Sequence, residues 1–244
     1  MSDATTFTGL VSAQAVLAAA RRPVLRLLVR RDATTRGLSR LIVAAQSAGA
    51  PVERLPDAAF RERFGRDVEE CALECGPRCD VTVSELADRL LNVPDAWLVA
   101  LEGIEDPHDL GAVLRTAVAA GSSAALLVRR LADVSPDVVA RSSAGTSETM
   151  TIAVADDMAD ALTDLAAAGF RVLAAAPDAE RTLYQTDLTG RLVWVLGGER
   201  RGISRRTLAA ADERVSLPMS TGVQSLTVVA CAGALFYETR RRRA

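Results

Sequence analysis

The chain has 244 residues, of which 49% are hydrophobic and 25% are charged, and its formal net charge is −2. A chain of this size buries one large core or two modest ones, so disorder is not expected to be its main state. All 29 basic residues are arginines and His108 is the single histidine, which excludes lysine Schiff-base chemistry and metal sites built from several histidines.

The chain begins with MSDATTFTG, which has neither the basic end nor the apolar run of a signal peptide. No later stretch reaches the roughly 18 consecutive apolar residues of a membrane span. We therefore expect a soluble cytoplasmic protein that does not act at a membrane.

The first part of the chain alternates between helical and strand patterns. The pattern predicts helices at Ser12–Ala20, Leu38–Ala48 and Ala58–Phe64, and strands at Val24–Val29 and Val52–Leu55. Together these elements are expected to form a small α/β unit.

Seven of the arginines lie between Arg21 and Arg40, around the first predicted strand. Guanidinium groups match the geometry of phosphates, so this cluster is a candidate surface for nucleic acid. The alternative is a solvated face around a buried strand. The candidate phosphate ligands are Arg21, Arg22, Arg26 and Arg30.

An acidic segment, RDVEECALECGPRCDVTVSELADRL, follows and is interrupted by Gly76–Pro77. It indicates a linker, and we place a domain boundary near residue 93, which gives domains 1–93 and 94–244. Cys71, Cys75 and Cys79 are a weak metal-site candidate, because thiols four residues apart share a helix face. Zinc sites usually contain CxxC pairs, so cysteines without a metal are the favoured alternative.

From Trp97 onward, an apolar strand, a turn and a helix repeat. The pattern predicts a last helix from Ser225 to about Arg240 and strands at Trp97–Leu101, Ala124–Val128, Thr151–Val154, Val172–Ala175, Leu192–Leu196 and Val215–Leu217. Such alternation predicts a parallel sheet with helices on both faces. Ligands bind beyond the carboxyl ends of such strands, at the turns Glu105–Leu110, Gly197–Ile203 and Pro218–Gln224.

Each of these turns, taken alone, has a purely structural interpretation. The glycines of VLGGERRGIS (195–204) fit no phosphate-loop pattern and suit an ordinary turn. Asp109 and Ser225 lie where helices are predicted to begin, and both residue types suit N-cap positions.

Taken together, the three turns resemble the three signature motifs of the SpoU (TrmH-like) branch of the SPOUT superfamily, in order and in spacing. The motifs read DPHDLGAVLRTAVAAG (106–121), VLGGERRGIS (195–204) and LPMSTGVQSLTVVA (217–230). The stretch RSSAGTSETMTIAV (141–154) is similar to an intermediate segment of that family. Residues 9–29, GLVSAQAVLAAARRPVLRLLV, resemble the small ribosomal-protein-like RNA-binding module that many members carry in front.

The resemblance implies an RNA ribose 2′-O-methyltransferase that uses S-adenosylmethionine. It implies an α/β fold in which a small RNA-binding domain precedes a parallel-sheet SPOUT domain, whose C-terminal part is tied in a trefoil knot. It further implies a homodimer formed through the knotted domain, with both protomers lining each site, and rRNA or tRNA as the partner.

Carried over residue by residue, the resemblance implies catalytic roles for Arg115, Glu199 and Ser225. The cofactor would be held by residues of the second and third motifs, namely Gly197, Leu217, Met219 and Leu226. Because the pKa of arginine exceeds about 12, Arg115 is better suited to orient the ribose hydroxyl and its phosphate than to remove a proton. The sulfonium leaving group is already activated, so no metal is implied.

Two positions depart from the family motifs. Asp109 and Thr227 stand where relatives usually have asparagine, and an ionised aspartate only accepts hydrogen bonds whereas an amide also donates them. A carboxylate at position 109 is expected either to pair with Arg115 or to repel RNA phosphate. Three alternatives remain open: RNA methylation with an altered site, methylation of a small molecule, or cofactor or RNA binding with catalysis lost.

Overall fold

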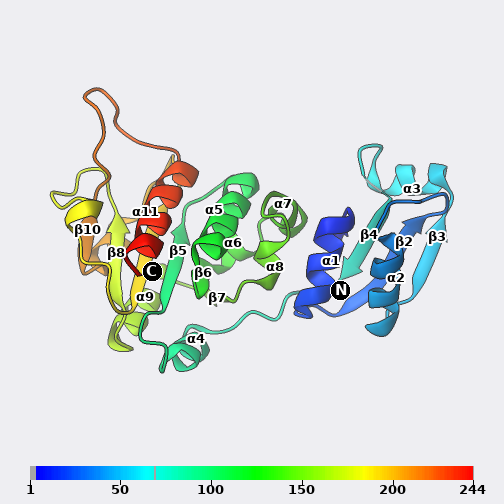
Figure 1. The fold of residues 1–244 in the computed structure, drawn as a ribbon, viewed down its shortest axis with the longest axis horizontal. Coiled ribbons are helices and arrows are strands. Elements are labelled where there is room, and N and C mark those ends of the chain that lie inside the picture. Colours follow the sequence, from blue (N-terminus) through cyan, green and yellow to red (C-terminus); the bar gives the residue numbers. More distant parts are fainter. Residues whose placement is uncertain (1–3, 69, 244) are drawn as a thin grey trace. The chain divides into compact units, whose positions relative to one another are not determined.

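The computed structural model describes residues 4–68 and 70–243, so residues 1–3, 69 and 244 of the predicted domains lie outside the described chain. The chain divides into two compact units (Figure 1). One comprises Met1–Cys79 and Ser135–Thr149, and the other comprises Asp80–Val134 and Met150–Ala244.

The first unit is built on a four-stranded mixed sheet of order β1-β4-β2-β3, in which only β2 and β3 are parallel. Its strands are β1 (Thr5–Thr8), β2 (Val24–Arg30), β3 (Val52–Leu55) and β4 (Cys71–Cys75). Its helices are α1 (Leu10–Ala19), α2 (Leu38–Ser47), α3 (Asp57–Phe64), α7 (Pro136–Ser142) and α8 (Thr146–Thr149).

Strand β2 shows how the sequence forms this sheet. Its side chains alternate, so Leu27 and Val29 enter the core shared with α1 and α2, whereas Leu28 packs on the opposite face against Phe60 of α3. Both faces are therefore covered at the centre of the strand, whereas Arg26 and Arg30 flank Leu28 on its face.

Cys71 and Cys75 lie in strand β4, so the helix on which their shared face was predicted is absent. The segment is fully buried, with both thiols in one apolar core and Ala72 in the other, as the two-residue period of a strand requires. Cys79 is exposed, and burial raises the pKa of the Cys75 thiol to about 12. Within the described chain, no three histidine, cysteine or acidic side chains are grouped so that they could hold a metal ion.

Residues 135–149 are far from the first sheet in sequence but pack within the same unit. The Thr8 backbone N–H donates to the Asp137 carboxylate at 2.8 Å. Arg22 and Glu148 form a two-pronged ion pair with N···O distances of 2.8 and 3.1 Å, and their side chains are only 6% and 2% exposed. A Cβ added at Gly145 would overlap the Ala15 methyl group, so α8 lies directly against α1.

The second unit is a six-stranded, wholly parallel sheet of order β10-β8-β9-β5-β6-β7, and all six strands predicted there are present. Its strands are β5 (Trp97–Glu102), β6 (Ala124–Val128), β7 (Ile152–Ala155), β8 (Arg171–Ala175), β9 (Leu192–Gly197) and β10 (Glu213–Val215). Its helices are α4 (Val83–Leu90), α5 (Pro107–Ala120), α6 (Arg129–Ala132), α9 (Met158–Ala167), α10 (Arg205–Ala209) and α11 (Val228–Arg243), with a 3₁₀ turn at Leu183–Gln185.

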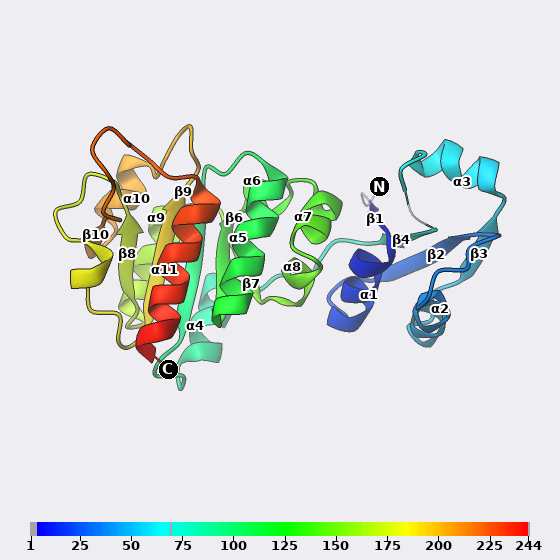
Figure 2. The same ribbon diagram turned by 45° about the horizontal axis from the view of Figure 1, so that its top comes forward.

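Helices cover both faces of this sheet (Figure 2). Helices α5 and α11 lie side by side on one face, where Trp97 packs on Phe236 with ring centroids 5.2 Å apart. Helices α4, α9 and α10 cover the other face over an apolar core that includes Leu98, Leu162 and Val193. Among the described residues, no helix combines the length and the apolar character needed to cross a bilayer.

The predicted boundary at residue 93 falls after α4, whereas the two units divide between Cys79 and Asp80. Helix α4 belongs to the second unit because Val81 pairs with Ala153, and Val83 and Leu86 enter the core beneath α9.

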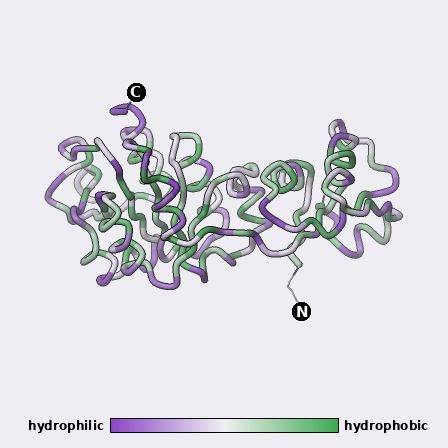
Figure 3. Tube along the Cα trace, turned by 90° about the horizontal axis from the view of Figure 1, so that it is seen from below, coloured by the Kyte–Doolittle hydropathy of each residue, from purple (hydrophilic) through white to green (hydrophobic). Residues whose placement is uncertain are grey.

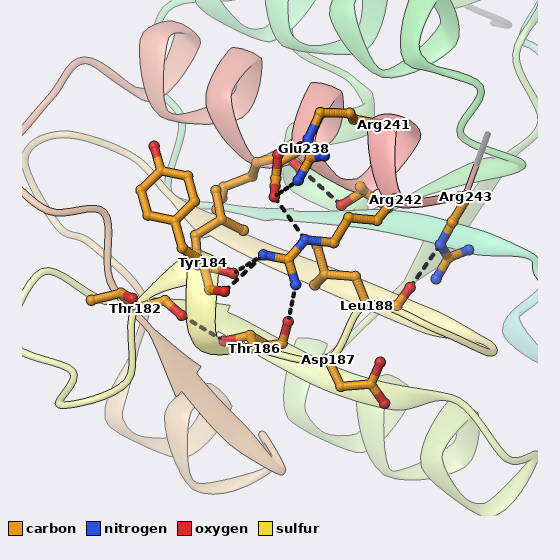
Figure 4. Close-up of polar contacts among 12 residues, drawn as sticks. Thr182, Tyr184, Thr186, Asp187, Leu188, Glu238, Arg241, Arg242 and Arg243 are labelled. Carbon is orange, nitrogen blue, oxygen red and sulfur yellow. Dashed lines mark hydrogen bonds and ion pairs between the residues drawn. The ribbon is translucent and has the colours of Figure 1, made fainter.

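The basic C-terminus of α11, hydrophilic in Figure 3, is held to the loop between β8 and β9 (Figure 4). The Arg242 guanidinium donates to the Tyr184 and Thr186 carbonyls, each at 2.8 Å, and to the Glu238 carboxylate at 2.7 Å. Hydrogen bonds from Arg241 and Arg242 hold the pKa of the Glu238 carboxyl at about 2. Arg242 therefore fixes α11 to the rest of the second unit, whereas Arg241 pairs within the helix.

Candidate active site

The turn after β9 is folded tightly against the end of β5. The Gly198 N–H donates to the Glu102 carbonyl at 2.8 Å, and the Gly202 N–H donates to the Gly198 carbonyl at 2.8 Å. A Cβ at Gly197 would overlap the backbone of Gly202, and one at Gly198 would overlap the Gly103 carbonyl. Only glycine allows the two turns to approach so closely.

The turn after β5 begins helix α5 with a different cap from the one expected. The N-cap is Asp106, whose carboxylate accepts the His108 N–H at 2.8 Å, and Pro107 is the first helical residue. Asp109 is the third residue of the helix, so the structure corrects its predicted N-cap role.

The loop Leu217–Thr227 leads from β10 to α11 and is mostly exposed. The Thr227 hydroxyl accepts the Ala230 N–H at 3.3 Å, so Thr227 rather than Ser225 caps the helix. The threonine found in place of the family's asparagine therefore has a structural role in this chain.

These turns enclose a cavity of about 310 Å³ at the carboxyl ends of β8, β9 and β10. Its lining is mainly apolar, and the expected site residues found in it are Gly197, Glu199, Leu217, Met219, Ser225 and Leu226. Burial raises the pKa of the Cys231 thiol, which also lines the cavity, to about 11. This thiol is therefore protonated near neutral pH.

A second pocket of about 360 Å³ shares Gly198, Glu199 and Val228 with the first cavity. The acidic side chains that line it are Glu105, Asp106, Asp109 and Glu199, and Arg200 is the cation in its wall. Burial, and then the charges of Asp106 and Glu199, raise the pKa of the Asp109 carboxyl. The pocket therefore presents hydrogen-bond acceptors to whatever enters it.

Arg115 lies on the exposed surface of α5 and lines neither cavity. It is six residues from Asp109, which places it about 9 Å further along the helix and roughly 120° around it. Within residues 4–68 and 70–243, its side chain has no hydrogen-bond or ion-pair partner. The expected pairing of Asp109 with Arg115 is therefore absent from this chain.

The candidate phosphate ligands of the first unit are largely neutralised by carboxylates. Arg22 is buried against Glu148, and Arg26 donates to Glu74 at 2.6 Å. Arg30 donates to Asp32 at 2.9 Å and to Glu70 at 3.2 Å. Arg22 in particular is too buried to reach RNA, so its expected role is corrected to a structural one.

Other arginines of the same cluster remain available. Arg31, Arg36 and Arg40 are exposed, and none of them forms an ion pair with another described residue. Arg54 also lies at this surface, because its guanidinium donates to the Arg31 carbonyl at 3.4 Å. The number of arginines in the sequence does not indicate which of them form ion pairs with carboxylates and which do not.

Sequence reasoning missed one wall of the first cavity. The segment Ala175–Asp178 lines it directly after β8, and Leu235 lines it from α11. The rule that ligands bind beyond the carboxyl ends of parallel strands applies to β8 as well, so it would have pointed to Pro177 and Asp178.

A model of the SpoU rRNA Methylase family matches residues 96–237. The 23S rRNA (guanosine-2′-O-)-methyltransferase RlmB of Pseudomonas putida is 35% identical over 164 residues, which cover 67% of this chain and 65% of that protein. RlmB of Ralstonia nicotianae is 31% identical over 216 residues, covering 88% of this chain and 85% of that protein.

Among solved structures, an AdoMet-bound rRNA methyltransferase from Sinorhizobium meliloti superposes with a TM-score of 0.83. The superposition covers 99% of this chain and 88% of that one, at 21% sequence identity. At this identity the similarity establishes the fold of the chain and does not extend to its substrate.

Proposed function

The chain belongs to the SpoU rRNA methylase family, and we propose that it transfers the methyl group of S-adenosylmethionine to the 2′-hydroxyl of a guanosine ribose in 23S rRNA. RlmB of P. putida and RlmB of R. nicotianae, both named for this reaction, are the relatives that support the substrate. The observation that carries the proposal is the shared wall at Gly198 and Glu199, which joins an apolar cavity to a pocket of acceptors.

The first cavity suits the cofactor. Its volume of about 310 Å³ and its apolar walls are those of a small-molecule site, and the glycine turn exposes backbone groups to a ligand. Gly197, Leu217, Met219 and Leu226 would hold S-adenosylmethionine, whose sulfonium carries an activated methyl group. The carboxylates of Asp178 and Glu199 complement its positive charge.

The second pocket suits the nucleotide that accepts the methyl group. A ribose hydroxyl is a poor nucleophile, so the site must orient it and accept its proton. Glu199 is the acidic residue that lines both cavities, so its carboxylate is the acceptor that we assign to this proton. Asp109 offers a second acceptor in the same pocket for a hydroxyl or for a base N–H group.

Arg115 lines neither cavity of its own chain. We therefore assign it to the site of a second copy, in the homodimer that the family resemblance implies. There, its guanidinium would hold the target phosphate and orient the ribose. This assignment also explains why Arg115 is exposed and has no ion-pair partner among the described residues of its own chain.

The first unit would bind the rRNA through its unpaired arginines Arg31, Arg36 and Arg40. Paired guanidinium groups such as those of Arg26 and Arg30 would have to leave a carboxylate first, which lowers their value as phosphate ligands. An rRNA substrate assigns the protein to the cytoplasm.

One observation favours a second candidate, methylation of a small molecule. Four acidic side chains line the second pocket, and they repel the phosphates of a polynucleotide. Calorimetry with S-adenosylmethionine, followed by transfer from labelled cofactor to total RNA and to a small-molecule extract, tests both. Label in RNA supports the proposal, label only in small molecules supports the second candidate, and cofactor binding without transfer indicates a homologue that has lost catalysis.

A further inference from the structure

Glu102 is the last residue of β5, and it holds both ends of the turn that follows β9. Its backbone carbonyl accepts the Gly198 N–H at 2.8 Å, and its carboxylate Oε2 accepts the Ser204 N–H at 2.9 Å. Neither bond belongs to a helix, and the carboxylate joins two residues that are 102 positions apart. One residue therefore sets the width of the turn from Gly198 to Ser204.

The residues between these two bonds form walls of both cavities. Gly198, Gly202 and Ile203 line the apolar cavity, and Gly198 and Glu199 also line the acidic pocket. A movement of Ser204 away from β5 would thus widen the first cavity at Gly202 and Ile203 and would carry Glu199 with it.

Other contacts of this turn are weaker or lie within it. The Gly202 N–H bonds to the Gly198 carbonyl inside the turn, which does not fix the turn to the sheet. Arg200 and Arg201 pair with Glu105 at 3.5 and 3.2 Å, but their side chains are 85% and 67% exposed. Exposed ion pairs contribute little, so the two hydrogen bonds to Glu102 are the polar contacts that fix the turn to the sheet, beside the packing of Ile203 on the apolar core.

We propose that Glu102 is a positioning residue for the cofactor. The Glu102 carboxylate keeps the Gly198–Ser204 turn closed, so that the cavity matches S-adenosylmethionine before the cofactor binds. The inference rests on the proposed function, because it assigns the apolar cavity to that cofactor. Preorganisation of this kind raises affinity, since the free energy of ordering the turn is spent during folding rather than during binding.

Variants at Ser204, the N-cap of helix α10, can distinguish the positioning role of Glu102 from the capping of that helix. Helix α10 has its own N-cap, because the Ser204 hydroxyl accepts the Thr207 N–H at 3.2 Å. Ser204→Ala removes this cap and leaves the N–H that Glu102 accepts. Ser204→Pro removes the N–H as well, and the Ser204 φ of −65° is already that of proline.

The test is calorimetric titration of the RNA-free protein with S-adenosylmethionine and with S-adenosylhomocysteine. We expect Glu102→Ala to weaken binding about tenfold, as loss of a charge-assisted hydrogen bond does, and Glu102→Gln to stay within about threefold of the wild type because its amide oxygen still accepts. Ser204→Pro should bind the cofactor more weakly than Ser204→Ala does. This loss of affinity should equal the loss that Glu102→Ala causes relative to the wild type. The double variant Glu102→Ala with Ser204→Pro should bind no worse than either single variant.

Thermal unfolding of each variant is measured alongside, so that affinity is compared only between folded proteins. If Ser204→Pro fails to fold, the difference in cofactor affinity between Glu102→Ala and Glu102→Gln still tests whether the Glu102 carboxylate positions the turn. Equal affinity of Glu102→Ala and wild type, or losses that simply add in the double variant, would overturn the inference. A wild-type protein that binds neither ligand would instead refute the proposed function.

Discussion

The Arg22 guanidinium and the Glu148 carboxylate meet in a buried, two-pronged ion pair that joins the connection between α1 and β2 to a segment 126 positions later in the chain. Removing Arg22 leaves the Glu148 carboxylate, which is 2% exposed, with the more distant Arg78 guanidinium at 3.8 Å. We expect Arg22→Ala to destabilise the protein by about 3 to 5 kcal/mol in chemical denaturation.

The double variant Arg22→Met with Glu148→Leu is the matched control. It removes both charges of the pair and keeps most of the volume, whereas Arg78 loses the Glu148 carboxylate and keeps its hydrogen bond to the Ser147 carbonyl, so the double variant should recover part of the lost stability. A double variant as unstable as Arg22→Ala would show that packing, and not the unpaired charge, determines the loss.

Arg242 is expected to stabilise the end of α11 through its bonds to the Tyr184 and Thr186 carbonyls. Arg242→Ala should lower the free energy of unfolding by roughly 1 to 3 kcal/mol, the range for hydrogen bonds to a charged group. Arg240→Ala is the control, because Arg240 is exposed and has no ion-pair partner among the described residues. Equal melting temperatures for the two variants would contradict this role.

Asp109 is expected to reduce stability at neutral pH. Because burial and neighbouring carboxylates raise its pKa, the folded protein holds the proton more tightly than the unfolded chain, so stability falls as pH rises from the unfolded pKa through the folded one. This effect outweighs the favourable position of an acid in the first turn of α5. Asp109→Asn should therefore stabilise the protein at pH 7 by on the order of 0.5 kcal/mol, with the gain absent near pH 3.5.

Thermal unfolding of Asp109→Asn at both pH values measures this difference. Asp88→Asn on α4 serves as the control, since Asp88 is exposed and lies outside both cavities. A gain that is the same at both pH values, or a loss at pH 7, would contradict a raised pKa for the Asp109 carboxyl in the folded protein.

Arg115→Ala is expected to lower methyl transfer at least about a hundredfold while cofactor affinity and melting temperature stay unchanged, because Arg115 lies outside the first cavity and has no partner in its own chain. Mixing Arg115→Ala protein with Glu199→Ala protein tests where it acts. If each site uses Arg115 from the second copy, a mixed dimer regains one intact site and activity returns. If Arg115 serves its own chain, every mixed dimer has two defective sites and stays inactive.

The parallel sheet of the second unit could be predicted because each strand is a short apolar run followed by a turn, as at 124–128 and 192–197. The three turns at its carboxyl edge were predicted for the same reason. The cap of α5 was wrongly assigned to Asp109, although an aspartate directly before Pro107 is a local signal for a helix start at Asp106.

What escaped prediction depends on contacts between distant residues. Strand β4 is buried on both faces, so its cysteines lacked the alternation that marks a half-buried strand. No local sequence pattern indicates that Arg22 pairs with Glu148. The assignment of residues 135–149 to the first unit could not be predicted for the same reason. For the same reason, the sequence could not tell which arginines of the Arg21–Arg40 cluster are free to meet phosphate.

The most direct test of the central claim is the chemical position of the transferred methyl group. Unmodified 23S rRNA is incubated with the protein and labelled S-adenosylmethionine, hydrolysed in alkali and analysed by mass spectrometry. A 2′-O-methyl group blocks alkaline cleavage at its own nucleotide, so the account predicts label in an alkali-resistant dinucleotide that contains 2′-O-methylguanosine. Label on a free, base-methylated nucleotide, or its absence from RNA while the cofactor binds, would contradict it.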